Sequence, residues 1–119
     1  MITIDKLMAK YNNNNQNESF VVTLGEDEYQ CRKMPFQKML ELDDEYDVET
    51  QKGAYERNLE VIYLSCDVFR KLLDKVDVEG DPHNIISQVL SPIEILTFYT
   101  QILNQYVGQT TKDVETIKK

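Results

Sequence analysis

Apolar residues are densest between positions 85 and 107, and their spacing predicts two consecutive helices. The stretch is interrupted once, where Ser91 and Pro92 stand next to each other. Serine is a preferred N-cap, proline suits the first helical turn, and Glu94 three residues after the serine completes a capping box. We therefore predict a helix over residues 92–107. The apolar positions that recur along it at helical spacing are Ile95, Leu96, Tyr99, Ile102, Leu103 and Tyr106.

Two short stretches near the N-terminus have the pattern of β-strands. Residues 20–24 are β-branched or aromatic, and residues 28–34 alternate apolar with polar side chains. A Gly-Glu-Asp sequence between them is typical of a turn, so the pattern predicts a β-hairpin. A lone hairpin is marginally stable in water. We therefore expect helices to cover one of its faces.

The first residues predict a separate amphipathic helix. It spans residues 2–11, with Thr3 as a capping residue. Its apolar side consists of Ile4, Leu7, Met8 and Tyr11. The asparagine-rich stretch that follows, residues 12–19, has poor helix propensity and is predicted to be a linker.

The centre of the chain alternates between helical and acidic stretches. Pro35 marks the start of a helix, which runs into an acidic segment at residues 41–49. Its apolar positions are Phe36, Met39, Leu40 and Leu42. Residues 51–54 (QKGA) are predicted to form the loop that follows.

Residues 55–66 predict a second central helix. Two continuations are open: Ser65 caps a new helix over residues 67–76, or one helix runs unbroken to Val76. The polar composition of residues 77–84 predicts a loop. A short helix over residues 85–90 then leads to the capping box.

These elements predict an α+β fold, mainly α-helical, with an N-terminal β-hairpin packed against a bundle of about four to five helices. Residues 1–17 hold the first helix and the linker, and residues 18–108 form a single globular domain. Gly108 is placed where a helix C-cap belongs. Residues 109–119 are polar and are predicted to be a flexible tail.

Charge and composition narrow the class of partner. The formal net charge is −8, so phosphates and anionic membrane surfaces repel the chain. We therefore expect no nucleic-acid partner and no membrane association. No apolar run reaches the length of a membrane span, and the first residues do not resemble a signal peptide. Two cysteines do not make a disulfide framework, which favours a reducing cytoplasm.

Candidate chemistry is sparse. His83 is the single histidine and is predicted to be a solvated loop residue, and Cys31 and Cys66 are predicted to be small buried hydrophobes. A calcium loop read from Asp43 has Val48 at its sixth position, where an EF-hand needs glycine. No glycine-rich phosphate loop or nucleophile motif is found. The sequence predicts no catalytic residue, no metal site and no cofactor, and a protein that is not an enzyme.

Five short segments together resemble a known family. They are Arg32-Lys33-Met34-Pro35-Phe36, Met39-Leu40-Glu41-Leu42, Val61-Ile62-Tyr63-Leu64-Ser65-Cys66, Asp81-Pro82-His83-Asn84-Ile85-Ile86 and Leu90-Ser91-Pro92-Ile93-Glu94-Ile95. Their order resembles that of the XkdN-like tail assembly chaperones of contractile-tailed phages and prophages of Gram-positive bacteria. The resemblance covers about residues 18–107.

The resemblance implies a protein that binds the helical tape measure protein, keeps it soluble and helps recruit tail tube subunits. Such a chaperone acts in the cytoplasm of the bacterial host and is absent from the mature virion. Its expected partners are the tape measure protein and the tail tube protein, with a homo-oligomer as a further possibility.

The candidate partner-binding surface is the part of the last helix that the core does not use, with the helix at residues 55–66 beside it. The candidate contact residues are Ile95, Leu96, Tyr99, Ile102, Leu103, Tyr106 and Tyr63. The alternative for each of them is an ordinary place in the core.

Two other function classes compete with the chaperone. An acidic phage-encoded inhibitor that mimics DNA would bind a basic host protein through the acidic run 43–49, and its binding would be sensitive to salt. A small structural subunit of the tail would be found in finished particles. The chaperone predicts an apolar, helical contact that survives salt.

Overall fold

The computed structural model describes residues 1–16 and 19–118, with side chains described at positions 1–12 and 19–106. Helices dominate this part of the chain, and an antiparallel strand pair lies near its N-terminus. The predicted α+β, mainly helical fold is confirmed. The elements in chain order are α1 (Ile4–Gln16), β1 (Ser19–Leu24), β2 (Asp27–Arg32), α2 (Phe36–Glu45), α3 (Gln51–Ser65), α4 (Asp67–Leu73), the 3₁₀ turn η1 (Pro82–Asn84), α5 (Ile85–Val89) and α6 (Pro92–Lys118).

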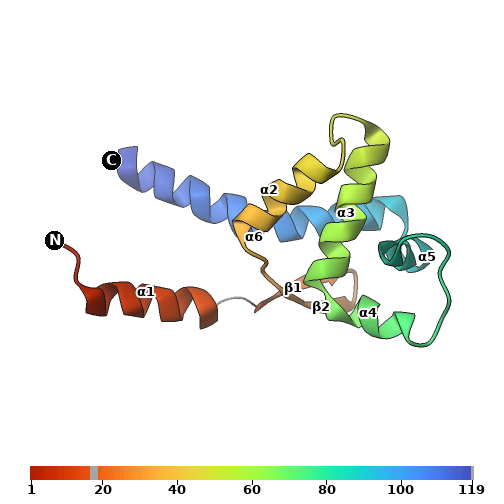
Figure 1. The fold of residues 1–119 in the computed structure, drawn as a ribbon, viewed down its shortest axis with the longest axis horizontal. Helices are drawn as coiled ribbons and strands as arrows, with labels where there is room; N and C mark the ends of the chain where they lie inside the picture. The colour runs from red at the N-terminus through yellow and green to blue at the C-terminus, as the bar shows by residue number, and fades with distance from the viewer. Residues whose placement is uncertain (17–18, 119) are drawn as a thin grey trace.

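Helix α6 is the axis on which the other elements pack. It contacts α3 and β1 most extensively and touches α5 near its start. Figure 1 shows α3 crossing α6, with the hairpin and α4 on one side of the crossing. Helix α1 extends away from these elements. The described part of the chain is therefore elongated, with principal extents of 54 × 31 × 28 Å.

The hairpin lies in the predicted place and presents its apolar face to the helices. Val22 on β1 pairs with Tyr29 on β2, and both Val22 and Cys31 are buried. Gly25 turns the chain at φ +60, a conformation that glycine adopts without steric cost. The ring of Tyr29 stacks on Phe69 at 5.8 Å between ring centroids. The hairpin is thus covered on one face, as its instability alone requires.

The core stripe of α6 includes Phe98 and excludes Leu96, and Leu103 of the predicted stripe is only partly buried. Phe98 is fully buried and is the largest such side chain, whereas the sequence prediction omitted it in favour of Leu96. The phenylalanine ring lies 5.1 Å from that of Tyr29 and 6.0 Å from that of Phe69. The aromatic contact between α6, β2 and α4 therefore forms around a residue that the predicted stripe passed over.

Two of the predicted N-caps, Ser91 and Thr3, are confirmed. The backbone N–H of Ser91 donates to Glu94 Oε1 at 2.9 Å, and the N–H of Glu94 donates to Ser91 Oγ at 3.3 Å, which are the two bonds of a capping box. The N–H of Lys6 donates to Thr3 Oγ1 at 3.3 Å at the start of α1.

Two predicted helix ends are wrong. Helix α1 continues through the asparagines to Gln16, and α6 continues past Gly108 to Lys118. Asparagine costs up to about 0.7 kcal/mol and glycine about 1 kcal/mol relative to alanine within a helix. Because extending a helix is far easier than starting one, such residues weaken it without ending it.

The start of α3 also differs from the prediction, because residues 51–54 form its first turn and not a loop. Thr50 is the N-cap and accepts the N–H of Gly53 at 3.0 Å. A Cβ atom at position 53 would lie 1.9 Å from the backbone oxygen of Asp47. Gly53 is therefore required by the close approach of the chain before the helix.

The structure decides between the two predicted continuations of α3. The helix ends at Cys66, whose φ of −123 and ψ of 105 are extended, and α4 starts at Asp67. The break is therefore present, although Cys66, and not Ser65, occupies the capping position. Helix α4 ends at Leu73, shorter than predicted.

Two side chains of α6 attach it to the hairpin region by hydrogen bonds to backbone groups. The Tyr106 hydroxyl accepts the N–H of Met34 at 2.8 Å and donates to the Met34 carbonyl at 2.9 Å. The Gln101 amide accepts from the Thr23 N–H at 3.0 Å and donates to its carbonyl at 2.7 Å. Each pair satisfies one donor and one acceptor of the main chain.

We predict that Tyr106→Phe lowers the free energy of unfolding by about 1–3 kcal/mol, because it leaves the N–H and carbonyl of Met34 without this partner. The measurement is urea unfolding followed by far-ultraviolet circular dichroism. Tyr11→Phe, on the exposed face of α1, is the matched control and should leave the midpoint unchanged. Equal midpoints for wild type and Tyr106→Phe would contradict the role of the hydroxyl.

Candidate partner-binding surfaces

The outer face of α6 is a largely apolar strip that lies beside the stripe facing the core. Ile93 is 74% exposed and Leu96 is 56% exposed. Leu103 is half-buried and packs against the edge of the core. The spacing of these three residues, at i, i+3 and i+10, keeps them on one side of the helix. We call this set, Ile93, Leu96 and Leu103, the outer face of α6.

The threonines between these residues do not make the strip polar. The Thr97 hydroxyl donates to the Ile93 carbonyl at 2.8 Å, and the Thr100 hydroxyl donates to the Leu96 carbonyl at 2.8 Å. Such bonds to the preceding turn engage the hydroxyl hydrogens within the helix. The strip therefore offers mostly methyl groups to a partner.

The structure separates the predicted contact residues into two groups. Ile95, Tyr99, Ile102 and Tyr106 belong to the core, and none of them is more than 7% exposed. They are unavailable as surface contacts, because α3 and the hairpin pack against that side of α6. This corrects the expectation for these four residues.

The other three predicted contact residues reach the surface to different degrees. Leu96 is exposed, whereas Leu103 and Tyr63 are partly buried. Tyr63 lies on α3, where Arg70 of α4 donates to its carbonyl and packs against its ring. Ile93 was missed, although its spacing from Leu96 is the signal that would have found it.

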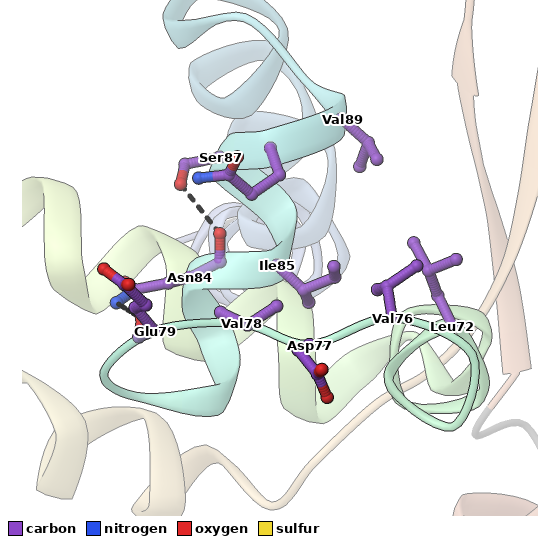
Figure 2. A pocket seen from close by; sticks show the side chains of 10 residues that line it. Leu72, Val76, Asp77, Val78, Glu79, Asn84, Ile85, Ser87 and Val89 are labelled. Carbon is purple, nitrogen blue, oxygen red and sulfur yellow. Dashed lines mark hydrogen bonds between the residues drawn. The ribbon is translucent and has the colours of Figure 1, made fainter.

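A second surface is a groove of about 660 Å³ between the end of α4, the following loop and α5. Figure 2 shows its lining side chains. The apolar lining residues are Leu72, Val76, Val78, Ile85 and Val89. Asp77 and Glu79 are exposed at its edge. We call this the α4–α5 groove; composition predicted the loop but not the groove.

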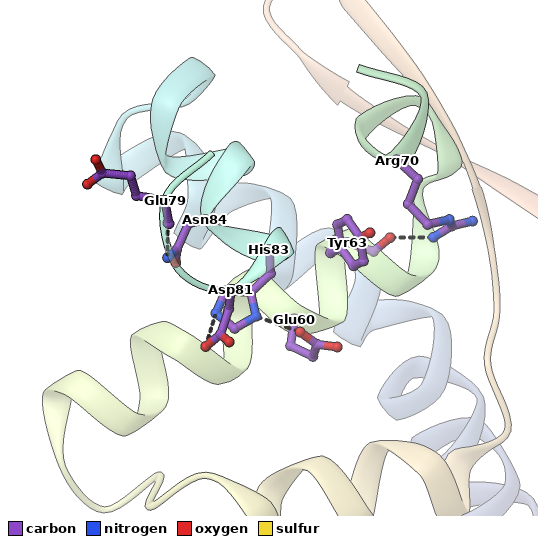
Figure 3. A network of polar contacts seen from close by, with 7 residues as sticks. All are labelled: Glu60, Tyr63, Arg70, Glu79, Asp81, His83 and Asn84. Atoms are coloured by element: carbon purple, nitrogen blue, oxygen red, sulfur yellow. Dashed lines mark hydrogen bonds and ion pairs between the residues drawn. The ribbon is translucent and has the colours of Figure 1, made fainter. Parts of the chain in front are cut away.

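The loop that borders the groove is held by a polar cluster around His83, shown in Figure 3. His83 is 3% exposed, which corrects the prediction of a solvated loop histidine. Its Nδ1 lies 2.6 Å from Glu60 Oε2 on α3, and its Nε2 lies 3.9 Å from Asp81 Oδ2. The turn at η1 docks on α3, and this contact buries the ring. The cluster fixes the position of the loop.

Two further contacts support the same loop. The amide of Asn84 donates to the Glu79 carbonyl at 3.2 Å, and Gly80 has φ +80. The ring of Tyr46 meets that of His83 edge-on at 6.2 Å. Burial, followed by the charge of Glu60, raises the pKa of the Tyr46 phenol to about 12.

The acidic run is partly neutralised within the fold. Asp43 accepts a hydrogen bond from Arg57 at 2.7 Å, and the same guanidinium lies over the ring of Tyr99 at 4.7 Å. The acidic side chains that remain exposed are Asp44, Glu45, Asp47 and Glu49. In the described part of the chain, no group of three or more histidine, cysteine or acidic residues is placed to hold a metal ion.

Cys31 and Cys66 are both free and buried. Hydrogen bonding between the thiols, together with burial, raises the pKa of Cys31 well above its ordinary value. The same hydrogen bond lowers the pKa of Cys66, so protonation disfavours reaction only at Cys31, and burial is what shields both thiols from reagents.

Comparisons with known proteins leave the family open. The chain matches no family model, and no curated protein or solved structure is significantly similar to it. Among the described helices, none is both long and apolar enough to cross a membrane.

We predict that neither thiol reacts with an aromatic disulfide reagent while the protein is folded, and that both react in denaturant. Burial blocks the reagent, and the raised pKa keeps Cys31 protonated. Absorbance of the released thiolate measures the reaction. A Thr97→Cys variant, with its new thiol on an exposed position of α6, is the positive control and should react at once. Rapid reaction of the wild type would contradict the buried pair.

Proposed function

We propose that the chain is a phage or prophage tail assembly chaperone that binds the tape measure protein, keeps it soluble and helps recruit tail tube subunits. The observation that carries the proposal is the outer face of α6, where Ile93 and Leu96 are exposed on a regular helix of a strongly acidic protein. The five family-like segments support the same function.

The dimensions of the outer face suit a helical client. From Ile93 to Leu103 the strip spans ten residue steps, or about 15 Å of helix. A client helix would cover it with its own apolar stripe, in the manner of an amphipathic helix laid on an apolar surface. Because the backbone of the strip is already helical, the chaperone side loses little conformational freedom on binding.

The small size of the strip favours reversible binding. Full burial of one aliphatic side chain contributes about 1.5–3 kcal/mol, and association costs several kcal/mol in lost freedom. Two or three such contacts give a weak complex from which assembling tube subunits can displace the chaperone. Several copies along one long client would keep it soluble together.

The charge of the chain has a separate role in this proposal. A net charge of −8 keeps many copies soluble and makes them repel one another when they are crowded on one client. The contact itself is apolar. We therefore expect binding that persists when salt is raised.

We predict that Leu96→Asp leaves the fold intact but weakens binding to a helical segment of the tape measure protein by about tenfold or more. Leu96 is exposed, so the substitution should change stability by no more than about 0.5 kcal/mol. Thermal unfolding checks the fold, and isothermal titration calorimetry at low and high salt checks binding. Leu40→Asp, at a 50% exposed position on α2, is the matched control and should bind like the wild type.

Ile95→Asp tests the opposite side of the same helix. Ile95 is 1% exposed, so an unpaired buried charge there should unfold the protein. Unchanged binding by folded Leu96→Asp would rule out the outer face. Loss of the complex in high salt, or on replacing the exposed acids at positions 44–49, would favour the acidic inhibitor. Recovery of the chain in finished tails would favour a structural subunit.

A further inference from the structure

Helix α1 carries an apolar stripe that is exposed in the described part of the chain. Its four apolar side chains recur at i, i+3, i+4 and i+7, the pattern of an amphipathic helix with a packed partner. Their exposed fractions are 74% for Ile4, 48% for Leu7, 53% for Met8 and 63% for Tyr11. None of the four packs against the core cluster. Four large exposed apolar residues on one helix face mark an interaction site.

The α4–α5 groove is the complementary surface in shape and polarity. It is concave, and its exposed apolar residues include Val76 (43%) and Val89 (50%). The stripe of α1 spans about 10 Å from Ile4 to Tyr11, which is two helical turns. The loop on one side of the groove is fixed by the His83 cluster, so the groove is formed before anything binds.

Charge also favours this pair of surfaces. Residues 1–16 contain Lys6, Lys10 and one acid, so this segment is net positive in a chain of net charge −8. The edge of the groove carries Asp77 and Glu79. Lys10 lies next to Leu7 around the helix, and its long side chain can reach an acidic rim while the stripe is buried. Attraction of opposite charges therefore fixes which surface α1 meets.

The position of α1 favours docking in the groove of another molecule over docking in its own. In Figure 1, α1 points away from the domain on the left, whereas α4 and α5 lie on the right. Within the described residues, α1 makes no extensive contact with α4 or α5 of its own molecule.

We propose that α1 of one copy docks in the α4–α5 groove of a second copy of this chain, with Lys10 facing Asp77 and Glu79. Reciprocal exchange of two helices closes a two-fold dimer, because each copy offers one helix and one groove. The outer face of α6 takes no part in the exchange. The proposal therefore does not rest on the chaperone function, and a dimer keeps two free outer faces.

The first test is sedimentation velocity on the full chain over a range of protein concentrations. We expect a monomer–dimer equilibrium that Leu7→Asp with Met8→Asp shifts to monomer, weakening association by about tenfold or more. Thermal unfolding should be unchanged at low concentration, because neither residue packs on the core. Val89→Asp in the groove should have the same effect, and Ile93→Asp on the outer face of α6 should have none.

Charge reversal gives the decisive comparison. Lys6→Glu with Lys10→Glu should weaken the dimer, and adding Asp77→Lys with Glu79→Lys in the same chain should restore it. A wild type that stays monomeric at every concentration would overturn the proposal. A dimer that survives Leu7→Asp with Met8→Asp, or one that Val89→Asp leaves intact, would also overturn it, since the contact would then lie elsewhere.

Discussion

The burial of one side of α6 against the hairpin is the interaction on which the rest of this structure depends. Two strands alone cannot hold their shape in water, because half of their apolar surface stays exposed. Phe98 supplies the missing surface by packing against Tyr29 and Phe69. Gln101 and Tyr106 add hydrogen bonds to the backbone of the strand and of the segment after the hairpin. The hairpin is therefore stable only as part of this contact.

The same packing decides which surfaces are free to bind. With one side of α6 committed to the core, Ile93 and Leu96 face outward on a helix that cannot rotate without exposing Phe98. A rigid apolar strip results, and it requires no rearrangement before a client arrives. The groove is held in place by a different mechanism, since buried His83 and its contact with Glu60 fix the bordering loop. The two surfaces thus have separate supports, and a substitution in one should leave the other intact.

Local signals predicted most of the elements because each is encoded within a few residues. The capping box at Ser91 and the alternation around Cys31 identified a helix start and a strand before any packing was known. Predictions failed where a distant partner decides the outcome. The choice of Phe98 over Leu96 depends on where the hairpin lies, and the need for Gly53 depends on the path of the chain at Asp47. His83 is surrounded by loop-forming residues in sequence, yet α3 buries it.

For the candidate surfaces, too, local patterns were predictable from the sequence and the effects of distant partners were not. Helical spacing identified α6 as the important element, but it could not distinguish the side that binds from the side that packs, because both sides carry aliphatic residues. The stripe on α1 shows the opposite case, since its pattern is clear in the sequence, yet none of its four apolar residues packs against the core cluster of the described chain. An amphipathic helix without an intramolecular partner keeps its apolar surface in water at a cost in free energy. Relief of that cost drives association, and the acidic rim of the groove favours docking of α1 there over other apolar surfaces.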